Sequence, residues 1–194
     1  AVQVVALVHL GGMGQLQVAS AMAANLFCGI VFGLCIVFAL LMGAKPKDYW
    51  KMLTEKDQVS SVTVAYGNAV FLLNVGLFGL MILGYYDLVG GAFNGITFGI
   101  IFCMLATCNS GSNPATVWPI LLGYVAASYL FRGVSALTGG QFAQAINAQA
   151  ILVGLCYANG LSPISRKYGW EYGFFAAMMP VRLPECVIIF RKYR

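Results

Sequence analysis

The chain has 194 residues, of which 60% are hydrophobic and 9% are charged. An ordinary soluble domain carries roughly 25% charged residues, so this composition excludes a water-soluble fold and predicts an integral membrane protein. The net charge of +5 at pH 7 does not indicate nucleic acid as a partner, because the basic residues gather in the loops where a membrane topology requires them.

Stretches of about 20 apolar residues are long enough to cross the hydrocarbon core of a bilayer as helices. The sequence contains five such stretches and a shorter one, which together predict an all-α, polytopic transmembrane bundle over residues 1–179. The lipid bilayer is therefore the first expected partner. We expect the spans at about 20–43, 61–84, 89–107, 114–131 and 141–160, with a sixth over 169–179.

The first span and the loop after it predict the orientation of the bundle. Gly29 and Gly33 are one helical turn apart and predict a place where a neighbouring helix approaches closely. The lysines of the 44–58 loop and the basic pair 166–167 place these loops on the cytoplasmic side by the positive-inside rule. Only Arg132 falls on the other side, so the second to fifth spans alternate without conflict.

The second span carries polar and flexible residues where a lipid-facing helix has none. Asn68 follows Gly67, and Asn74 lies further along the same span. Their spacing of six residues places the two amides about 240° apart around a regular helix, so they cannot share one face. Either the helix is broken near Gly67 or the two amides serve different neighbours. A break inside hydrocarbon is tolerated only where protein or a cavity surrounds it.

The third span combines three glycines with two polar side chains. Gly91, Gly95 and Gly99 recur at every fourth position, which predicts a doubled stripe of small residues where helices pack closely. Asn94 and Thr97 flank this stripe, so we expect an amide and a hydroxyl where two backbones come together.

The segment from Cys108 to Pro114 is the most unusual interruption of the apolar pattern. It contains Asn109, and it ends in Asn113 and Pro114, which are favourable as the N-cap and first residue of a new helix. At membrane depth, such a helix start is the kind that binds solutes in transporters. At the interface it would be a short cytoplasmic turn, and the sequence leaves both placements open.

The last third of the chain and the cysteines are less informative. The amides Gln141, Gln144 and Asn147 fit a polar seam toward the bundle interior and an interfacial helix start equally well. The basic tail 180–194 is discordant, and a truncation, an altered reading frame or a membrane-surface tail would each explain it. The six cysteines contain no Cys-x-x-Cys and lie largely in apolar spans, so neither a metal nor a redox cofactor is expected.

Residues 67–80, 93–99 and 111–123 share a pattern of Asn and Gly, and the Leu161–Ser165 segment accompanies it. With these segments the chain resembles an uncharacterised family of polytopic bacterial membrane proteins, domain of unknown function fifteen seventy-six. The resemblance covers about residues 60–179 and implies the membrane architecture without an activity. Members of that family look about twice as long, which implies that this chain is one half of a repeat-built fold.

Residues 93–99 are also similar to a Phe-Asn-Gly-x-x-x-Gly element of urea transporters. In that family the element lies downstream of an amide-x-x-Phe-x-Asn-Asn-Pro element. Asn68, Phe71 and Asn74 match this second element loosely, but Val75 replaces its proline. The distant likeness implies permeation of a small solute.

These observations predict a channel or secondary transporter for a small solute, with no charged residue in the core. The alternative is a non-transporting membrane scaffold or partner subunit, for instance in a homo-oligomer. An enzyme is not expected, because His9 is the only histidine and the spans contain no catalytic pairing. The expected location is the bacterial cytoplasmic membrane. The candidate solute-binding residues are Asn68, Asn74, Asn94, Thr97, Asn109 and Asn113.

Overall fold

The computed structural model describes residues 17–57, 59–139 and 145–179. Every regular element in these ranges is a helix, so the predicted all-α fold is confirmed. The elements are α2 (Gln17–Leu41), α3 (Pro46–Thr54), α4 (Val62–Tyr66), α5 (Asn68–Val89), α6 (Gly95–Ala106), the 3₁₀ turn η1 (Thr107–Ser110), α7 (Pro114–Thr138), α8 (Gln149–Ala158), the 3₁₀ turn η2 (Asn159–Leu161), α9 (Ser162–Tyr168) and α10 (Trp170–Met178). The long helices α2, α5 and α7 are each followed by shorter ones.

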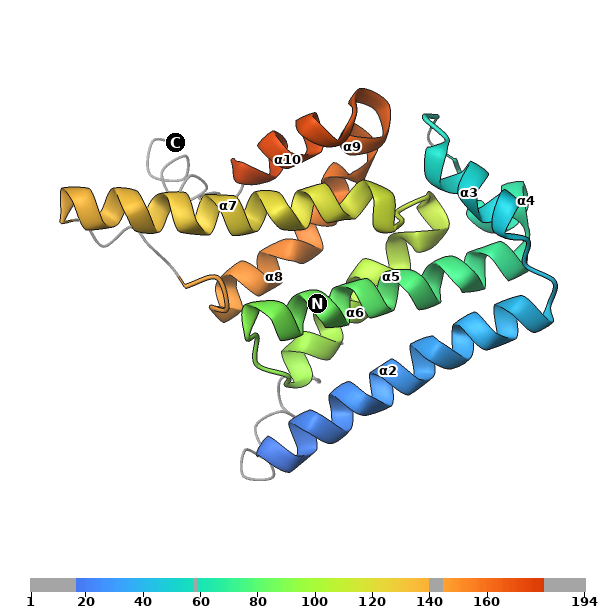
Figure 1. Ribbon diagram of the computed structural model, residues 1–194, viewed down its shortest axis with the longest axis horizontal. Coiled ribbons are helices and arrows are strands. Elements are labelled where there is room, and N and C mark those ends of the chain that lie inside the picture. The colour runs from blue at the N-terminus through green and yellow to red at the C-terminus, as the bar shows by residue number, and fades with distance from the viewer. Residues whose placement is uncertain (1–16, 58, 140–144, 180–194) are drawn as a thin grey trace, which may run out of the picture.

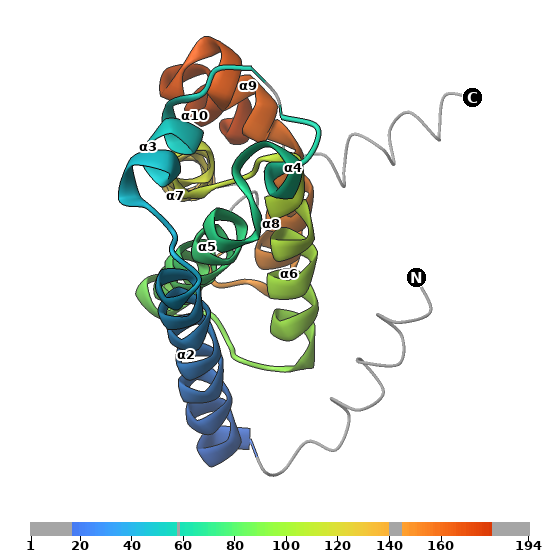
Figure 2. The same ribbon diagram turned by 90° about the vertical axis from the view of Figure 1, so that its right-hand side faces the viewer.

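Three of these helices are long and apolar enough to cross a membrane, namely Ala23–Leu41 within α2, Asn68–Val89 and Pro114–Thr138. In both ribbon views α5 lies between α2 and α7 (Figures 1 and 2), and Figure 2 shows α6 and α8 together on one side of α5. α10 runs along α7, and their contact includes stacked Trp118 and Trp170 rings with centroids 6.0 Å apart. The short helices are thus held between or against the long ones.

The second span is broken at Gly67, one of the two possibilities that the sequence left open. Gly67 has φ 86° and ψ 165°, a combination that is essentially restricted to glycine. α4 ends before this residue and α5 begins after it. Gly169 has nearly the same conformation, with φ 110° and ψ 166°, between α9 and α10. Each break follows a tyrosine and separates a short helix from the next helix.

α5 continues beyond the expected end of its span at residue 84. The reason is burial, because Tyr85 and Tyr86 are only 7% and 1% exposed and pack into the core from this helix. α5 ends at Gly90, whose left-handed φ of 66° lets its amide return to the carbonyls of the last turn. The chain therefore leaves α5 later than hydropathy alone indicates.

α6 and α8 are shorter than the expected spans 89–107 and 141–160. They have 12 and 10 residues, which at 1.5 Å per residue is about 18 Å and 15 Å, against a hydrocarbon core of roughly 30 Å. α6 begins directly after Asn94, which forms a capping box with Thr97. Gly91 lies in the loop before the helix, so the expected stripe of three glycines is not carried by one continuous helix.

Of the glycines expected to pack closely, Gly91 does so, because an added Cβ there would lie 2.8 Å from Cδ1 of Tyr86. An added Cβ at Gly29, Gly33 or Gly99 would meet no atom within 4 Å. At Gly76 of α5, by contrast, an added Cβ would lie 2.8 Å from the carbonyl oxygen of Phe32 in α2. The α2–α5 contact therefore depends on small residues in α5 and large ones in α2.

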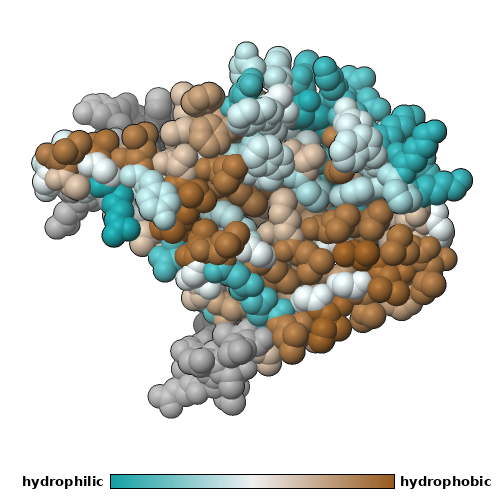
Figure 3. Space-filling view, viewed as in Figure 1, coloured by the Kyte–Doolittle hydropathy of each residue, from teal (hydrophilic) through white to brown (hydrophobic). Residues whose placement is uncertain are grey.

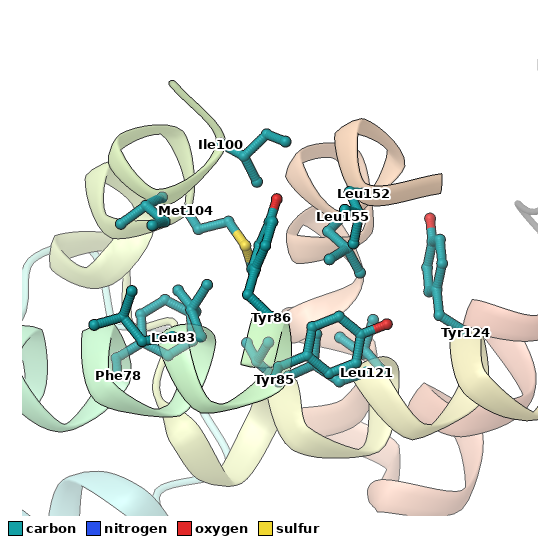
Figure 4. Close-up of a cluster of buried hydrophobic side chains, with 14 of the residues drawn as sticks. Phe78, Leu83, Tyr85, Tyr86, Ile100, Met104, Leu121, Tyr124, Leu152 and Leu155 are labelled. Carbon is teal, nitrogen blue, oxygen red and sulfur yellow. The ribbon is translucent and has the colours of Figure 1, made fainter. Parts of the chain in front are cut away.

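The main core lies between α5, α6, α7 and α8 and is apolar. Figure 4 shows Tyr86 of α5 between side chains of α6 on one side and side chains of α8 on the other. All of these side chains are at most 3% exposed. We call this contact the apolar seam, and it consists of Tyr86, Ile100, Met104, Leu152 and Leu155.

The surface is divided between a hydrophobic body and one strongly polar end. In Figure 3 brown surface covers α2 and much of α7, whereas teal surface is densest at the end that carries α3 and α4. α9 lies at this end too, because Nη1 of Arg166 donates to the carbonyl of Asp57 at 3.4 Å. We call this the basic end, after Lys45, Lys47, Lys51, Lys56, Arg166 and Lys167.

Candidate functional site

A polar cavity of about 170 Å³ lies at the basic end, where α6 and α8 both stop. The turns η1 and η2, which follow these two helices, supply much of its wall, and α9 supplies most of the rest. Most of the lining residues carry a hydroxyl, amide or guanidinium group, although more of the exposed lining surface is apolar than polar. The lining residues are Thr107, Ser110, Gly111, Ser112, Asn159, Gly160, Ser162, Pro163 and Arg166.

Asn159 ties the ends of α6 and α8 together at this cavity. Its side chain is 2% exposed, and its Nδ2 donates to the carbonyl of Met104 at 3.1 Å and to the hydroxyl of Thr107. The carbonyl of Met104 also accepts from the amide and the hydroxyl of Thr107, so Asn159 joins the hydrogen bonds that close the end of α6. Oδ1 of Asn159 is buried and accepts no hydrogen bond from a described residue. Such an unpaired buried oxygen costs about 1–3 kcal/mol.

The loop before α7 is held in place by three helices. Asn113 caps α7, because its Oδ1 accepts from the amide of Thr116 at 3.0 Å. Ser162 of α9 donates to the hydroxyl oxygen of Thr116 at 2.9 Å. Asn74 of α5 donates through Nδ2 to the carbonyl of Ser112 at 2.9 Å. The wall of the cavity is therefore fixed by hydrogen bonds from α5, α7 and α9.

Among the described residues that line the cavity, Arg166 alone is charged. It is 9% exposed, and its Nη2 and Nη1 donate to the carbonyls of Gly111 and Asp57. It forms no ion pair with a carboxylate of the described residues. Burial lowers the pKa of Arg166, whereas the nearby Tyr66 and Glu55 act in the opposite direction. The guanidinium stays protonated, because arginine is not deprotonated in proteins.

Gly111 allows this guanidinium to approach the backbone closely. Its φ is 96°, in the left-handed region that favours glycine. An added Cβ would lie 3.3 Å from both Nη1 and Nη2 of Arg166, which is tighter than an ordinary van der Waals contact. The glycine is therefore required both by the turn from η1 into α7 and by the position of the charged side chain.

Three of the six predicted solute-binding residues surround the cavity without lining it. Asn74 and Asn113 are fully buried and hold the loop before α7. Asn109 is exposed in η1, and its Oδ1 accepts from the amide of Thr63 and the hydroxyl of Ser61, both at 3.2 Å. Asn109 thus caps the start of α4. A contact of these amides with a solute stays a prediction.

The other three predicted residues lie away from the cavity. Asn68 is exposed at the start of α5. Asn94 and Thr97 lie at the opposite end of α6, where Nδ2 of Asn94 donates to Oε1 of Gln149 at 3.4 Å. Asn147 also belongs to this second polar group, since its Nδ2 donates to a carbonyl in the loop after α5 at 3.4 Å. Gln141, Gln144, His9 and the tail 180–194 lie outside the described residues.

Asn159 and Arg166 are the residues that sequence reasoning did not identify as site residues. In the sequence, Arg166 indicated only the orientation of the bundle, as one of the basic residues expected on the cytoplasmic side. Asn159 lies at the end of an apolar stretch. A signal was present, because residues 159–163 read Asn-Gly-Leu-Ser-Pro. This is a polar break followed by a proline in the first turn of a helix, as at residues 109–114. Both breaks end a short helix at the same cavity.

A family model described as protein of unknown function (DUF1576) matches residues 42–190. The chain belongs to the DUF1576 family. The match confirms the predicted family, and it includes α3 to α10 and every residue that lines the cavity. Searches of curated proteins and of solved structures found no match for the DUF1576 chain. The likeness of residues 93–99 to urea transporters therefore has no support from these comparisons.

Proposed function

We propose that the DUF1576 chain is a multi-pass protein of the bacterial cytoplasmic membrane that conducts a small solute, as a channel or a secondary transporter. The observation that carries the proposal is the polar cavity at the ends of α6 and α8. Interrupted helices in a membrane are tolerated where they line a cavity, and transporters build solute sites at such interruptions. The basic end would face the cytoplasm by the positive-inside rule.

The proposed solute path follows the contact between α6 and α8. At the basic end it starts in the polar cavity, and at the other end it starts beside Asn94 and Gln149. Between these two polar groups the apolar seam closes the path, as the packing of Tyr86 against α6 and α8 illustrates (Figure 4). A solute would cross only when this seam opens.

Flux through the full-length protein in proteoliposomes tests this proposal. Light scattering after an osmotic step should show entry of at least one solute, from a panel of urea, glycerol, acetate and glycolate, that is faster than in protein-free liposomes. Leu155→Trp enlarges a fully buried side chain of the seam and should abolish that flux. Leu137→Trp is the matched control, because Leu137 is 89% exposed. Equal entry with and without protein for every solute would refute the assignment.

A second candidate function is a scaffold or partner subunit, and the outward face of α2 favours it. Gly29 and Gly33 have no neighbouring atom within 4 Å of an added Cβ, so a helix of a second copy has room to approach there. The double change Gly29→Leu and Gly33→Leu should then convert a dimer to a monomer, as measured by light scattering of the protein in detergent. A wild-type protein that is already monomeric would remove this support.

A further inference from the structure

We propose that the cavity at the basic end binds a small oxyanion that carries a hydrogen-bond donor of its own. Hydroxycarboxylates such as glycolate, hydrogen carbonate and dihydrogen phosphate share this chemistry. The inference rests on the proposed solute path and names the class of its substrate. Its basis is that Arg166, Ser110, Ser112 and Asn159 line one cavity and that Oδ1 of Asn159 is buried beside it without a hydrogen-bond partner among the described residues.

The charge of the lining selects an anion. Arginine has five N–H donors, and Arg166 uses two of them for the carbonyls of Gly111 and Asp57. A buried charge costs several kcal/mol unless a partner compensates it. Glu55 lies near enough to act on this charge, but no carboxylate of the described residues forms an ion pair with it. An oxyanion in the cavity would supply that partner, because two oxygens of a carboxylate or a phosphate match the guanidinium fork.

Asn159 adds the requirement for a donor on the ligand. Its Nδ2 is already engaged by Met104 and Thr107, so the amide cannot turn over without losing both bonds. Its free Oδ1 is an acceptor and repels a bare anion, whereas it accepts from an O–H or N–H group. A bound oxyanion would direct its charged oxygens to Arg166 and its donor to Asn159. Acetate and chloride lack such a donor.

The size of the cavity suits a ligand of a few atoms. Its volume of about 170 Å³ is many times the roughly 10–15 Å³ that a single water needs. Glycolate and dihydrogen phosphate, each with five non-hydrogen atoms, fit this space. Ser110 and Ser112 make no side-chain hydrogen bond to other described residues, so their hydroxyls can donate to the ligand oxygens.

Thermal unfolding of the full-length protein in detergent measures binding independently of transport. Glycolate should raise the midpoint temperature saturably, because a ligand that binds only the folded state stabilises it. Acetate has the same charge without the hydroxyl, and its dissociation constant should be at least about tenfold higher. Phosphate and hydrogen carbonate, in separate titrations, distinguish an inorganic ligand from a carboxylate. Sodium chloride at equal ionic strength is the control for salt.

Variants assign the effect to the cavity. Arg166→Gln should raise the dissociation constant of glycolate at least about tenfold, whereas Lys167→Gln changes an exposed neighbour on α9 and should leave it unchanged. Arg166 also holds two backbone carbonyls, so its loss can lower stability by itself. Ser112→Ala is therefore the second variant, because it removes only a hydroxyl of the lining and should weaken binding severalfold.

The outcomes separate the anion site from the solute path. Equal binding by the wild type and Arg166→Gln, or no saturable shift with any of the oxyanions, overturns the site. Equal shifts with acetate and glycolate overturn the requirement for a donor. Arg166-dependent binding without flux in proteoliposomes supports the site and removes the path. Flux of a neutral solute that Arg166→Gln leaves unchanged supports the path and overturns the anion as its substrate.

Discussion

Alanine at Gly67 or at Gly169 is expected to destabilise the protein by about 1–3 kcal/mol at each position. Gly67 has φ 86° and ψ 165°, and Gly169 has φ 110° and ψ 166°, so a side chain at either position forces the backbone into a strained conformation. Each glycine fixes the angle between a short helix and the next one. Relief of the strain would move α4 away from η1, or α9 away from α7, and both short helices contact these elements at the basic end.

The midpoint of chemical or thermal unfolding in detergent measures this loss for each variant. Gly84→Ala is the matched control, because Gly84 lies within α5 and an added Cβ there meets no atom within 4 Å. Its replacement should be neutral or should stabilise the helix by up to about 1 kcal/mol. Equal midpoints for all three variants would show that the glycine conformation at the two breaks is not required.

Gly123→Ala is expected to weaken the contact of α7 with α10 by about 1–3 kcal/mol. An added Cβ would lie 2.5 Å from the carbonyl oxygen of Phe174 and 2.8 Å from Cβ of Ala177. The first of these is a backbone atom, so no rotation of a side chain relieves the overlap and α10 must move as a whole. α10 follows directly after α9, which lines the cavity, so the binding of glycolate should weaken in parallel.

Gly133→Ala is the control for this change on the same helix. An added Cβ at Gly133 meets no atom within 4 Å, so alanine there changes helix propensity without a new contact. The two variants are compared by their unfolding midpoints and by the glycolate concentration at half-maximal stabilisation. A Gly123→Ala protein as stable as Gly133→Ala would contradict the close approach of α7 and α10.

Hydropathy predicted where apolar helices lie but not how far each one extends. The expected spans 20–43, 61–84 and 114–131 correspond largely to α2, α5 and α7, because a long apolar run has no lower-energy state in lipid than a helix. The ends of the short α6 depend instead on a few specific side-chain hydrogen bonds. Asn94 starts this helix through its capping box, and the amide of Asn159 bonds to its last turn. An average of hydropathy over a stretch of residues does not detect such bonds.

The candidate site was only partly predictable for a related reason. Asparagine at a helix break first serves the unpaired backbone groups of the helix end, and Asn94, Asn109 and Asn113 all do so here. An amide nitrogen or oxygen that is left without a hydrogen-bond partner can be identified only once the tertiary contacts are known. Asn159 lies 52 residues from its partner Thr107 in the sequence, so its unpaired Oδ1 has no local signature.

Main-chain carbonyls, rather than side chains, hold the buried guanidinium, and this has a consequence for how DUF1576 sequences can diverge. Residue 57 contributes only its carbonyl, which every amino acid possesses, so that position is free to drift. Position 111 is not free to change in this way, because its φ is 96° and the Cβ of any other residue would lie too close to the guanidinium. We therefore expect the arginine and this glycine to be retained together. A relative with a neutral residue in place of Arg166 should have changed its ligand class rather than weakened the same interaction.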